Sequence, residues 1–153
     1  EALQLLFTAD RALHLEQEIL PALEAGKIVI TDRYAFSSIA YGAVELGNPK
    51  WLQDLNRRFI LPDQTFLIQV SPKICAMRIK ASHYEAELYS EEKKLQRVWQ
   101  GYEALTAEYA GIKIVRGERT ELEVVQEMKD ATLRLLSGSE VRAEGVDRQP
   151  TAG

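Results

Sequence analysis

The chain has 153 residues, of which 46% are apolar and 27% are charged, and its formal net charge at pH 7 is −4. This length and apolar content suit one domain with a buried core, and the acidic balance argues against a nucleic-acid surface. No run of about 18 or more apolar residues occurs, so we expect no membrane-spanning helix. The single cysteine, Cys75, rules out an internal disulfide and fits a reducing compartment. We therefore expect a cytoplasmic protein whose partners are small molecules.

The chain is predicted to open with a long helix over residues 2–25. Apolar residues recur along it at helical spacing, and Gly26 occupies the stop position. Pro21 is a candidate break. The residues expected to form its core face are Ala2, Leu5, Leu6, Ala9, Ala12, Leu13, Leu20 and Leu23.

A strand is predicted next, over residues 27–32. Its unbroken apolar character is typical of a strand buried on both faces of a parallel sheet. Helices are expected over 37–46 and 50–58, because the cluster Gly47-Asn48-Pro49 between them favours a turn.

The second half of the chain alternates strands with helices. We expect a strand over 65–70, followed by a helix that Ser71-Pro72 opens and that ends near 81. A polar irregular segment over 82–94 and a long helix ending near 108 come next. The chain then continues with a strand over 113–115 and a helix that starts at the capping box Thr120-Glu121-Leu122-Glu123 and ends near 136. Such alternation predicts an α/β fold with a parallel sheet and right-handed crossovers. Residues 1–137 form the expected domain, and the polar, aperiodic residues 138–153 are expected to be a disordered tail.

Asp32 and Arg33 are the most informative residues, because they follow the apolar run at the end of the first predicted strand. Ligands of open α/β sheets bind outside the carboxyl ends of the strands. A carboxylate such as Asp32 suits a hydrated magnesium ion, and the planar fork of Arg33 matches a phosphate. These two residues alone leave open an ordinary surface ion pair.

Phe7 and Arg11 lie at i and i+4 on the first helix, and His14 follows at i+7. An aromatic ring and a cation on one stripe suit a flat base. The alternative for Phe7 is a place in the core. For His14 a solvated or packed side chain is the better interpretation.

These residues belong to blocks that closely resemble the thymidylate kinase family. The blocks are Leu5-Leu6-Phe7-Thr8-Ala9-Asp10-Arg11, Asp32-Arg33-Tyr34, Ser37 and Ala40-Tyr41. The spacing between them also resembles the family, and the resemblance continues more loosely to about Ser137. One local departure is Gly42, where bacterial and archaeal relatives commonly have Gln.

The resemblance implies phosphoryl transfer from ATP to dTMP in dTTP biosynthesis, giving dTDP and ADP with Mg²⁺ as the cofactor. For the acceptor it implies that Phe7 stacks on thymine and that Arg11 donates to a base oxygen. Arg33 would hold the dTMP phosphate, and Asp32 would act through magnesium or its waters. The other residues that it places near dTMP are Ser37, Ser38, Tyr41 beside the deoxyribose, and Tyr89 and Gln96 in the lid region. On the donor side, Arg78 would pack on adenine and Arg119 would touch it.

The implied fold is the three-layer parallel sheet of the P-loop kinases, with strand order 2-3-1-4-5. Nothing in the chain fits the phosphate-binding motif G-x-x-x-x-G-K-[ST], and the first predicted strand corresponds to the third of the family. We therefore expect an incomplete domain that lacks the first two strands of the family and is inactive alone. An empty slot in the sheet would expose apolar strand edges, which predicts low stability or self-association.

Two other functions remain open from the sequence. A deoxynucleoside kinase has a comparable acid-Arg motif after a strand, but Tyr34 and the block that includes Phe7 and Arg11 favour the monophosphate kinase. A noncatalytic relic or interaction domain would explain the missing phosphate-binding motif, but it would not explain why the acceptor residues are present. A homodimer is also compatible with the sequence.

Overall fold

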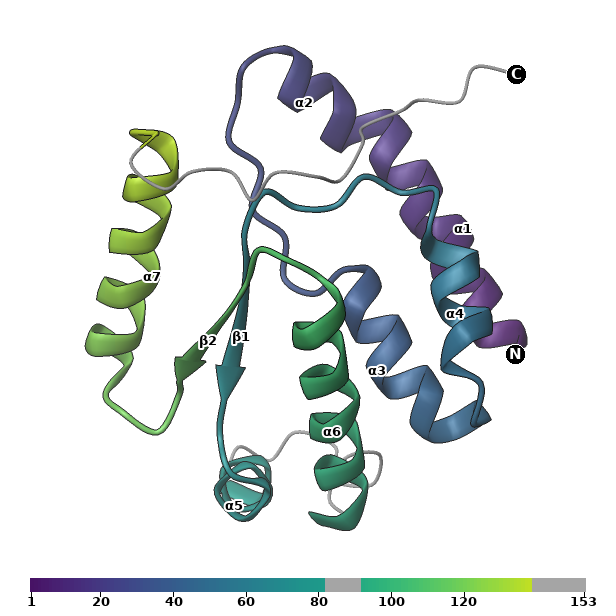
Figure 1. Cartoon of the computed structure of the whole chain (residues 1–153), viewed down its shortest axis with the longest axis vertical. Helices are drawn as coiled ribbons and strands as arrows, with labels where there is room; N and C mark the ends of the chain where they lie inside the picture. Colours follow the sequence, from purple (N-terminus) through teal and green to yellow (C-terminus); the bar gives the residue numbers. More distant parts are fainter. Residues whose placement is uncertain (82–91, 139–153) are drawn as a thin grey trace. The chain divides into compact units, whose positions relative to one another are not determined.

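The computed structural model describes residues 1–81 and 92–138 (Figure 1). The chain divides into two compact units. Glu1–Phe59 and Arg97–Leu105 form the first unit, and the second takes in Ile60–Gln96 and Thr106–Gly153. Most of the expected tail, residues 139–153, lies outside the described residues. Among the helices of the described part, none combines the length and the apolar character needed to cross a membrane.

The first unit is built from helices. They are α1 (Ala2–His14), the π-helical turn η1 (Leu15–Ile19), α2 (Leu20–Glu24), α3 (Ala35–Leu46), α4 (Pro49–Asn56) and the middle of α6 (Glu92–Glu108). Leu52 of α4 and Ala40 of α3 are fully buried. Gly101 lets α6 approach α3 closely, because a Cβ added at Gly101 would lie 3.3 Å from the Cα of Ala40.

The long N-terminal helix and its end are confirmed, but it does not break at Pro21. The helix continues through η1, and Pro21 falls in the first turn of α2, where a missing N–H is tolerated. Gly26 ends the helix with φ of 73°. Its N–H donates to the Leu23 carbonyl, and the Lys27 N–H donates to that of Ala22, which together form a Schellman motif.

The predicted core face of this helix was wrong. Leu6 is 66% exposed, and Leu5 and Leu13 are about half exposed, whereas Gln4 and Leu15 are buried. The side that packs on α3 and α4 includes the polar side chains of Gln4 and Arg11, which an apolar periodicity cannot detect. The leucine face has no cover among the described residues of this unit.

The strand predicted over 27–32 was also wrong. This segment has no regular secondary structure, and Ile28 and Ile30 are 62% and 90% exposed. A β-strand is stabilised by a hydrogen-bonded neighbour. The segment has none in the described part of the chain, so its apolar run does not lead to burial.

The second unit contains a parallel pair of strands, β1 (Thr65–Gln69) and β2 (Ile112–Arg116), side by side in Figure 1. Thr65 pairs with Ile112, and the register continues to Gln69 and Arg116. Between them in the sequence lie α5 (Pro72–Ala81) and α6, as a parallel crossover requires. The helix α7 (Glu121–Leu136) packs on β2, burying Val115, Val124 and Ala131.

Gly117 lies directly after β2 at the end of this sheet. It is buried, and its N–H donates to the Gln69 carbonyl at 2.7 Å. A Cβ at this position would collide with Ile68 and would lie 2.7 Å from Val70 Cγ2. Only glycine therefore fits this close approach between the two strands.

The predicted capping box at the start of α7 is confirmed. The Thr120 side chain accepts from the Glu123 N–H, and the Glu123 carboxylate accepts from the Thr120 N–H at 3.0 Å. The Thr120 hydroxyl also donates to the carboxylate. These bonds, the hydroxyl first and the backbone N–H next, lower the pKa of Glu123.

Thr120→Ala should therefore destabilise the protein by about 1 kcal/mol, the usual value of such a cap. Urea unfolding followed by circular dichroism would measure it. The lowered pKa of Glu123 stabilises the folded state above the unfolded pKa of about 4.3, and this contribution is lost as the pH falls through the folded pKa. As the pH falls through that range, the difference in the free energy of unfolding between Thr120→Ala and the unmodified protein should become smaller.

Thr132→Ala is the matched control in the same helix. Its hydroxyl donates to the Met128 carbonyl, which is already part of the helical ladder, and alanine is the better helix former. This variant should stay within about 0.5 kcal/mol of the unmodified protein. An equal loss in both variants would contradict the role of the cap.

Candidate functional site

Arg33, Ser37 and Tyr41 come together at the start of α3. The guanidinium carbon of Arg33 lies 5.2 Å from the centre of the Tyr41 ring. The rings of Tyr41 and Tyr102 are nearly perpendicular, with centroids 6.3 Å apart, and the Tyr102 hydroxyl is 2.8 Å from Ser37 Oγ. Three residues predicted for the acceptor site thus form one group with a tyrosine of α6.

The turn before α3 holds Arg33 in an unusual backbone conformation. Its φ is 63°, in the left-handed region that L-residues rarely adopt. The Thr31 hydroxyl donates to the Arg33 carbonyl at 3.0 Å and stabilises this turn. Asp32 and Arg33 are both exposed. The conformation therefore presents a carboxylate and a guanidinium to solvent, next to the first turn of α3.

Arg11 forms a second group with Ser38, another predicted acceptor residue. Arg11 Nη2 donates to Ser38 Oγ at 2.8 Å, and Nη1 donates to Asn56 Oδ1. Its guanidinium carbon lies 5.3 Å from the Tyr34 ring centre and 5.7 Å from that of Phe59. Burial lowers the pKa of Arg11, although the charges of Tyr34 and Asp10 oppose the shift. Burial likewise raises the pKa of Tyr34.

Phe7 lies one turn before Arg11 and is 47% exposed. The interpretation of Phe7 as a core residue was therefore wrong, and an exposed ring beside an arginine is available to stack on a ligand. His14 is 3.4 Å from Glu18 on the helix surface, with both side chains solvated. The structure supports the simple surface interpretation of His14.

Gly42, the departure from the family pattern, faces Gln4 and Leu52. A Cβ at this position would lie 2.8 Å from Leu52 Cδ1 and 3.1 Å from the amide of Gln4. The Gln4 side chain of α1 therefore occupies the space that a side chain at position 42 would need.

Arg78 and Arg119, predicted for the donor, line one cavity of about 540 Å³ in the second unit. The rest of its lining is largely apolar and consists of Ile68, Gly117, Glu121, Val124, Val125 and Met128. Arg78 donates to the Gly117 carbonyl at 3.1 Å, and Arg119 Nε donates to the carbonyl of Arg116. Two cations over an apolar surface suit a purine with phosphates attached.

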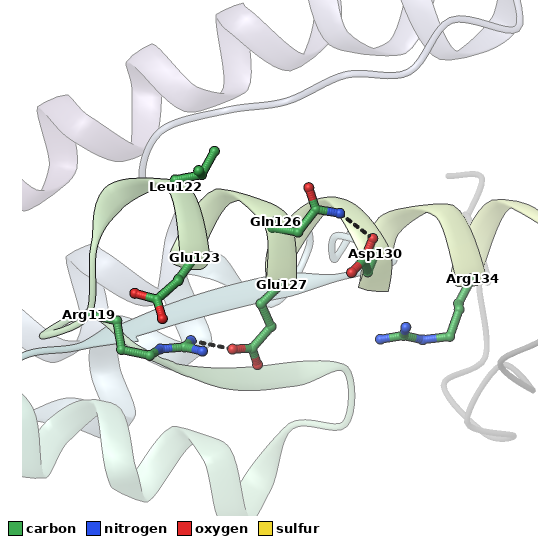
Figure 2. Close-up of a pocket in the computed structure, with 7 residues that line it drawn as sticks. All are labelled: Arg119, Leu122, Glu123, Gln126, Glu127, Asp130 and Arg134. Carbon is green, nitrogen blue, oxygen red and sulfur yellow. Dashed lines mark hydrogen bonds and ion pairs between the residues drawn. The ribbon is translucent and has the colours of Figure 1, made fainter.

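A cavity of about 550 Å³ runs along α7 and shares Arg119 (Figure 2). Figure 2 shows Arg119 and Glu127 pointing toward one another as an ion pair, and Gln126 donating to Asp130. The hydrogen bond from Arg119 lowers the pKa of Glu127. Because Arg119 is engaged by Glu127 and the Asp130 carboxylate by Gln126, this surface is a weaker candidate for a ligand than the apolar cavity.

The predicted lid residues are Tyr89 and Gln96. Tyr89 lies outside the described residues, and Gln96 is exposed near the start of α6. Both assignments stay predictions.

Sequence reasoning missed Tyr34, Asn56, Phe59 and Tyr102. Tyr34 was part of the quoted motif, but nothing in the motif indicated that its ring would face Arg11. Asn56, Phe59 and Tyr102 lie far from the motif along the chain. Only the packing of α4 and α6 against α3 brings them to it.

The parallel strand pair and its helical crossover define an α/β protein. Residues 1–128 match the family model described as thymidylate kinase. The chain therefore belongs to the thymidylate kinase family, whose members have the P-loop kinase α/β fold.

Individual relatives agree with this assignment. The chain is 36% identical to a protein of Thermococcus kodakarensis and 38% identical to one of Thermococcus gammatolerans, each named a probable thymidylate kinase, over 92% and 78% of its length. It is 34% identical, over 87% of its length, to the thymidylate kinase of Maridesulfovibrio salexigens. The matched part covers 68%, 58% and 67% of these three relatives, respectively.

Proposed function

We propose that the protein phosphorylates dTMP with ATP, giving dTDP and ADP, and that this chain carries the acceptor site and the lid. The observation that supports this most directly is the group formed by Arg33, Ser37 and Tyr41. It presents a guanidinium at an exposed turn beside an aromatic ring. A nucleoside monophosphate offers the matching phosphate and sugar.

Arg33 would hold the phosphate of dTMP, and Tyr41 would lie against the deoxyribose and disfavour a 2′-hydroxyl. Phe7 would stack on thymine. Arg11 would donate to a base oxygen, with Ser37 and Ser38 near the acceptor. Because an acceptor phosphate is already ionised near neutral pH, no residue is needed as a strong base. Positioning and charge neutralisation carry the reaction.

Asp32 is the residue that we assign to magnesium. Within the described residues, no three His, Cys, Asp or Glu side chains gather into a metal site. A single exposed carboxylate fits a magnesium ion whose other ligands are nucleotide phosphates and water. When bound, the ion would neutralise charge on those phosphates. Asp32 would orient it through its carboxylate or through bound water.

For the donor, we propose that Arg78 packs on the adenine of ATP and that Arg119 contacts its edge. Both arginines line the largely apolar cavity beside Val124. Gly117 supports this site, because its carbonyl accepts the Arg78 hydrogen bond.

The finer features of the fold also belong to this proposal. We infer a three-layer fold with a central parallel sheet, in which β1 and β2 are neighbouring strands. Residues 28–32 would form a strand of this sheet only when a further strand lies beside them. These 153 residues contain no G-x-x-x-x-G-K-[ST] motif. The chain alone should therefore bind dTMP better than ATP and turn over neither at a useful rate.

An acceptor test decides the function. It uses the full protein, meaning this chain together with any further residues of its natural polypeptide. The protein is incubated with MgATP and either dTMP or thymidine, and the products are separated by chromatography. Formation of dTDP from dTMP, with thymidine unchanged, is the expected result. Phosphorylation of thymidine alone would identify a deoxynucleoside kinase. Turnover of neither acceptor would favour a noncatalytic domain.

A further inference from the structure

Arg11 is held by a neutral partner on each of its terminal nitrogens. Asn56 at the end of α4 accepts from Nη1, and Ser38 of α3 accepts from Nη2. The rings of Tyr34 and Phe59 lie within 6 Å of the same guanidinium. Two hydrogen bonds at opposite nitrogens define the plane of the guanidinium as well as its place.

Asn56 is itself tightly oriented. It is 6% exposed, and its Nδ2 donates to the Leu52 carbonyl at 2.7 Å, one turn earlier in α4. The amide can satisfy both partners in one orientation only, because its nitrogen cannot accept from Arg11 and its oxygen cannot donate to a carbonyl. The end of α4 therefore offers Arg11 a rigid acceptor.

The chemistry of this partner preserves the charge of Arg11. A guanidinium has five N–H donors, and the bonds to Asn56 and Ser38 use one on each terminal nitrogen. Arg11 forms no ion pair within residues 1–81 and 92–138. A carboxylate in place of Asn56 would neutralise the cation, whereas the amide leaves charge and donors for a ligand.

We propose that Asn56 is a positioning residue that orients Arg11 toward the acceptor base and thereby sets the preference among pyrimidines. The inference rests on the proposed function. An oriented Arg11 donates to the carbonyl oxygen of thymine and is opposed by the amino group of cytosine. A freely rotating guanidinium would find other partners and distinguish the two bases less well.

Asn56→Leu in the full protein tests this inference, with Asn48→Ala as the matched control. Asn48 caps the N-terminus of the same helix by accepting from the Trp51 N–H at 3.1 Å, and it is exposed. Both variants weaken α4, but only Asn56→Leu removes an acceptor from Arg11. Calorimetric affinities for dTMP and dCMP give the base preference. Nitrogen NMR of arginine side chains reports rotation of the Arg11 guanidinium.

Asn56→Leu should lower the ratio of dTMP to dCMP affinity by about ten- to a hundredfold, the range for one hydrogen bond to a charged group. It should also speed rotation of the Arg11 guanidinium. Asn48→Ala should change neither. An unchanged ratio in Asn56→Leu, or an equal change in both variants, would overturn the proposal.

NMR of the unmodified protein is a second test, which needs no substitution. Its Arg11 terminal nitrogens should give separate, slowly exchanging signals, and a single averaged signal would overturn the positioning role even if Asn56→Leu fails to fold. If the unmodified protein binds no dTMP, the proposed function fails, while the NMR arm still decides whether Asn56 orients Arg11.

Discussion

Replacing Arg33 with glycine should lower phosphoryl transfer to dTMP by about a hundredfold or more, because it removes the cation that we assign to the acceptor phosphate. The same change should leave the melting temperature nearly unaltered. At a φ of 63° an L-residue is disfavoured by roughly 1–2 kcal/mol, and glycine avoids this strain. This relief acts against the loss of the Arg33 contacts, of which the one with the Tyr41 ring contributes about 0.5–1 kcal/mol at an exposed site.

Initial rates and thermal unfolding of the full protein would measure both effects. Arg58→Gly is the control, because Arg58 is also an exposed arginine in a loop of the first unit but does not have a positive φ. It should keep its rate and lose a little stability through added chain entropy. Activity of Arg33→Gly within about tenfold of the unmodified protein would contradict the phosphate-binding role.

Gly117→Ala should have the largest effect on stability, about 1–3 kcal/mol, as expected for overpacking. The new methyl group would collide with Ile68 and press on Val70 and on the Gln69 carbonyl. Because the Gly117 carbonyl also accepts from Arg78, any backbone shift there displaces a residue of the cavity that we assign to ATP. We expect the affinity of the full protein for ATP to fall by about tenfold.

Gly26→Ala separates these two consequences. Gly26 has φ of 73° and open space where a Cβ would be, so this variant should lose about 1 kcal/mol through backbone strain alone. Its affinity for ATP should remain unchanged. Denaturant unfolding and calorimetric titration of both variants provide the comparison. A weaker ATP affinity in Gly26→Ala as well would mean that lost stability, and not the cavity, controls binding.

Local signals in the sequence predicted the helices well. The capping box at Thr120 and the stop at Gly26 depend on bonds within a few residues, so they can be read without the rest of the fold. Asn48 and Pro49 open α4 for the same reason: the Asn side chain caps the helix, and proline suits its first position. β1 and β2 also formed where they were expected.

Some features that depend on partners distant in the sequence were not predicted, although the strand pair of β1 and β2 was. The run around Ile30 looks like a buried strand, but burial requires a neighbouring strand. The leucines of α1 look like a core face, but α3 and α4 contact the side that carries Gln4 and Arg11. Hydrophobic periodicity measures the capacity for burial and does not identify the surface that covers it.

The candidate site likewise contains residues that the sequence predicted and residues that it did not. Arg33, Ser37 and Tyr41 lie within one short stretch, so their motif predicted them together. Tyr102 and Asn56 reach the site from α6 and α4. An unremarkable tyrosine and asparagine in helices carry no local signal, and only their contacts reveal them.

The segment before Arg33 links ordering of the chain to ligand affinity. Residues 28–31 form no backbone hydrogen bond with another described residue, whereas the amides of β1 and β2 are paired. The amide hydrogens of residues 28–31 should therefore exchange rapidly with water. A ligand that engages Arg33 must also restrict this segment, at about 1–2 kcal/mol for each residue that it orders. Whatever pre-orders residues 28–31 will therefore tighten acceptor binding by the same free energy, and the slowing of amide exchange there gives a direct measure of that gain.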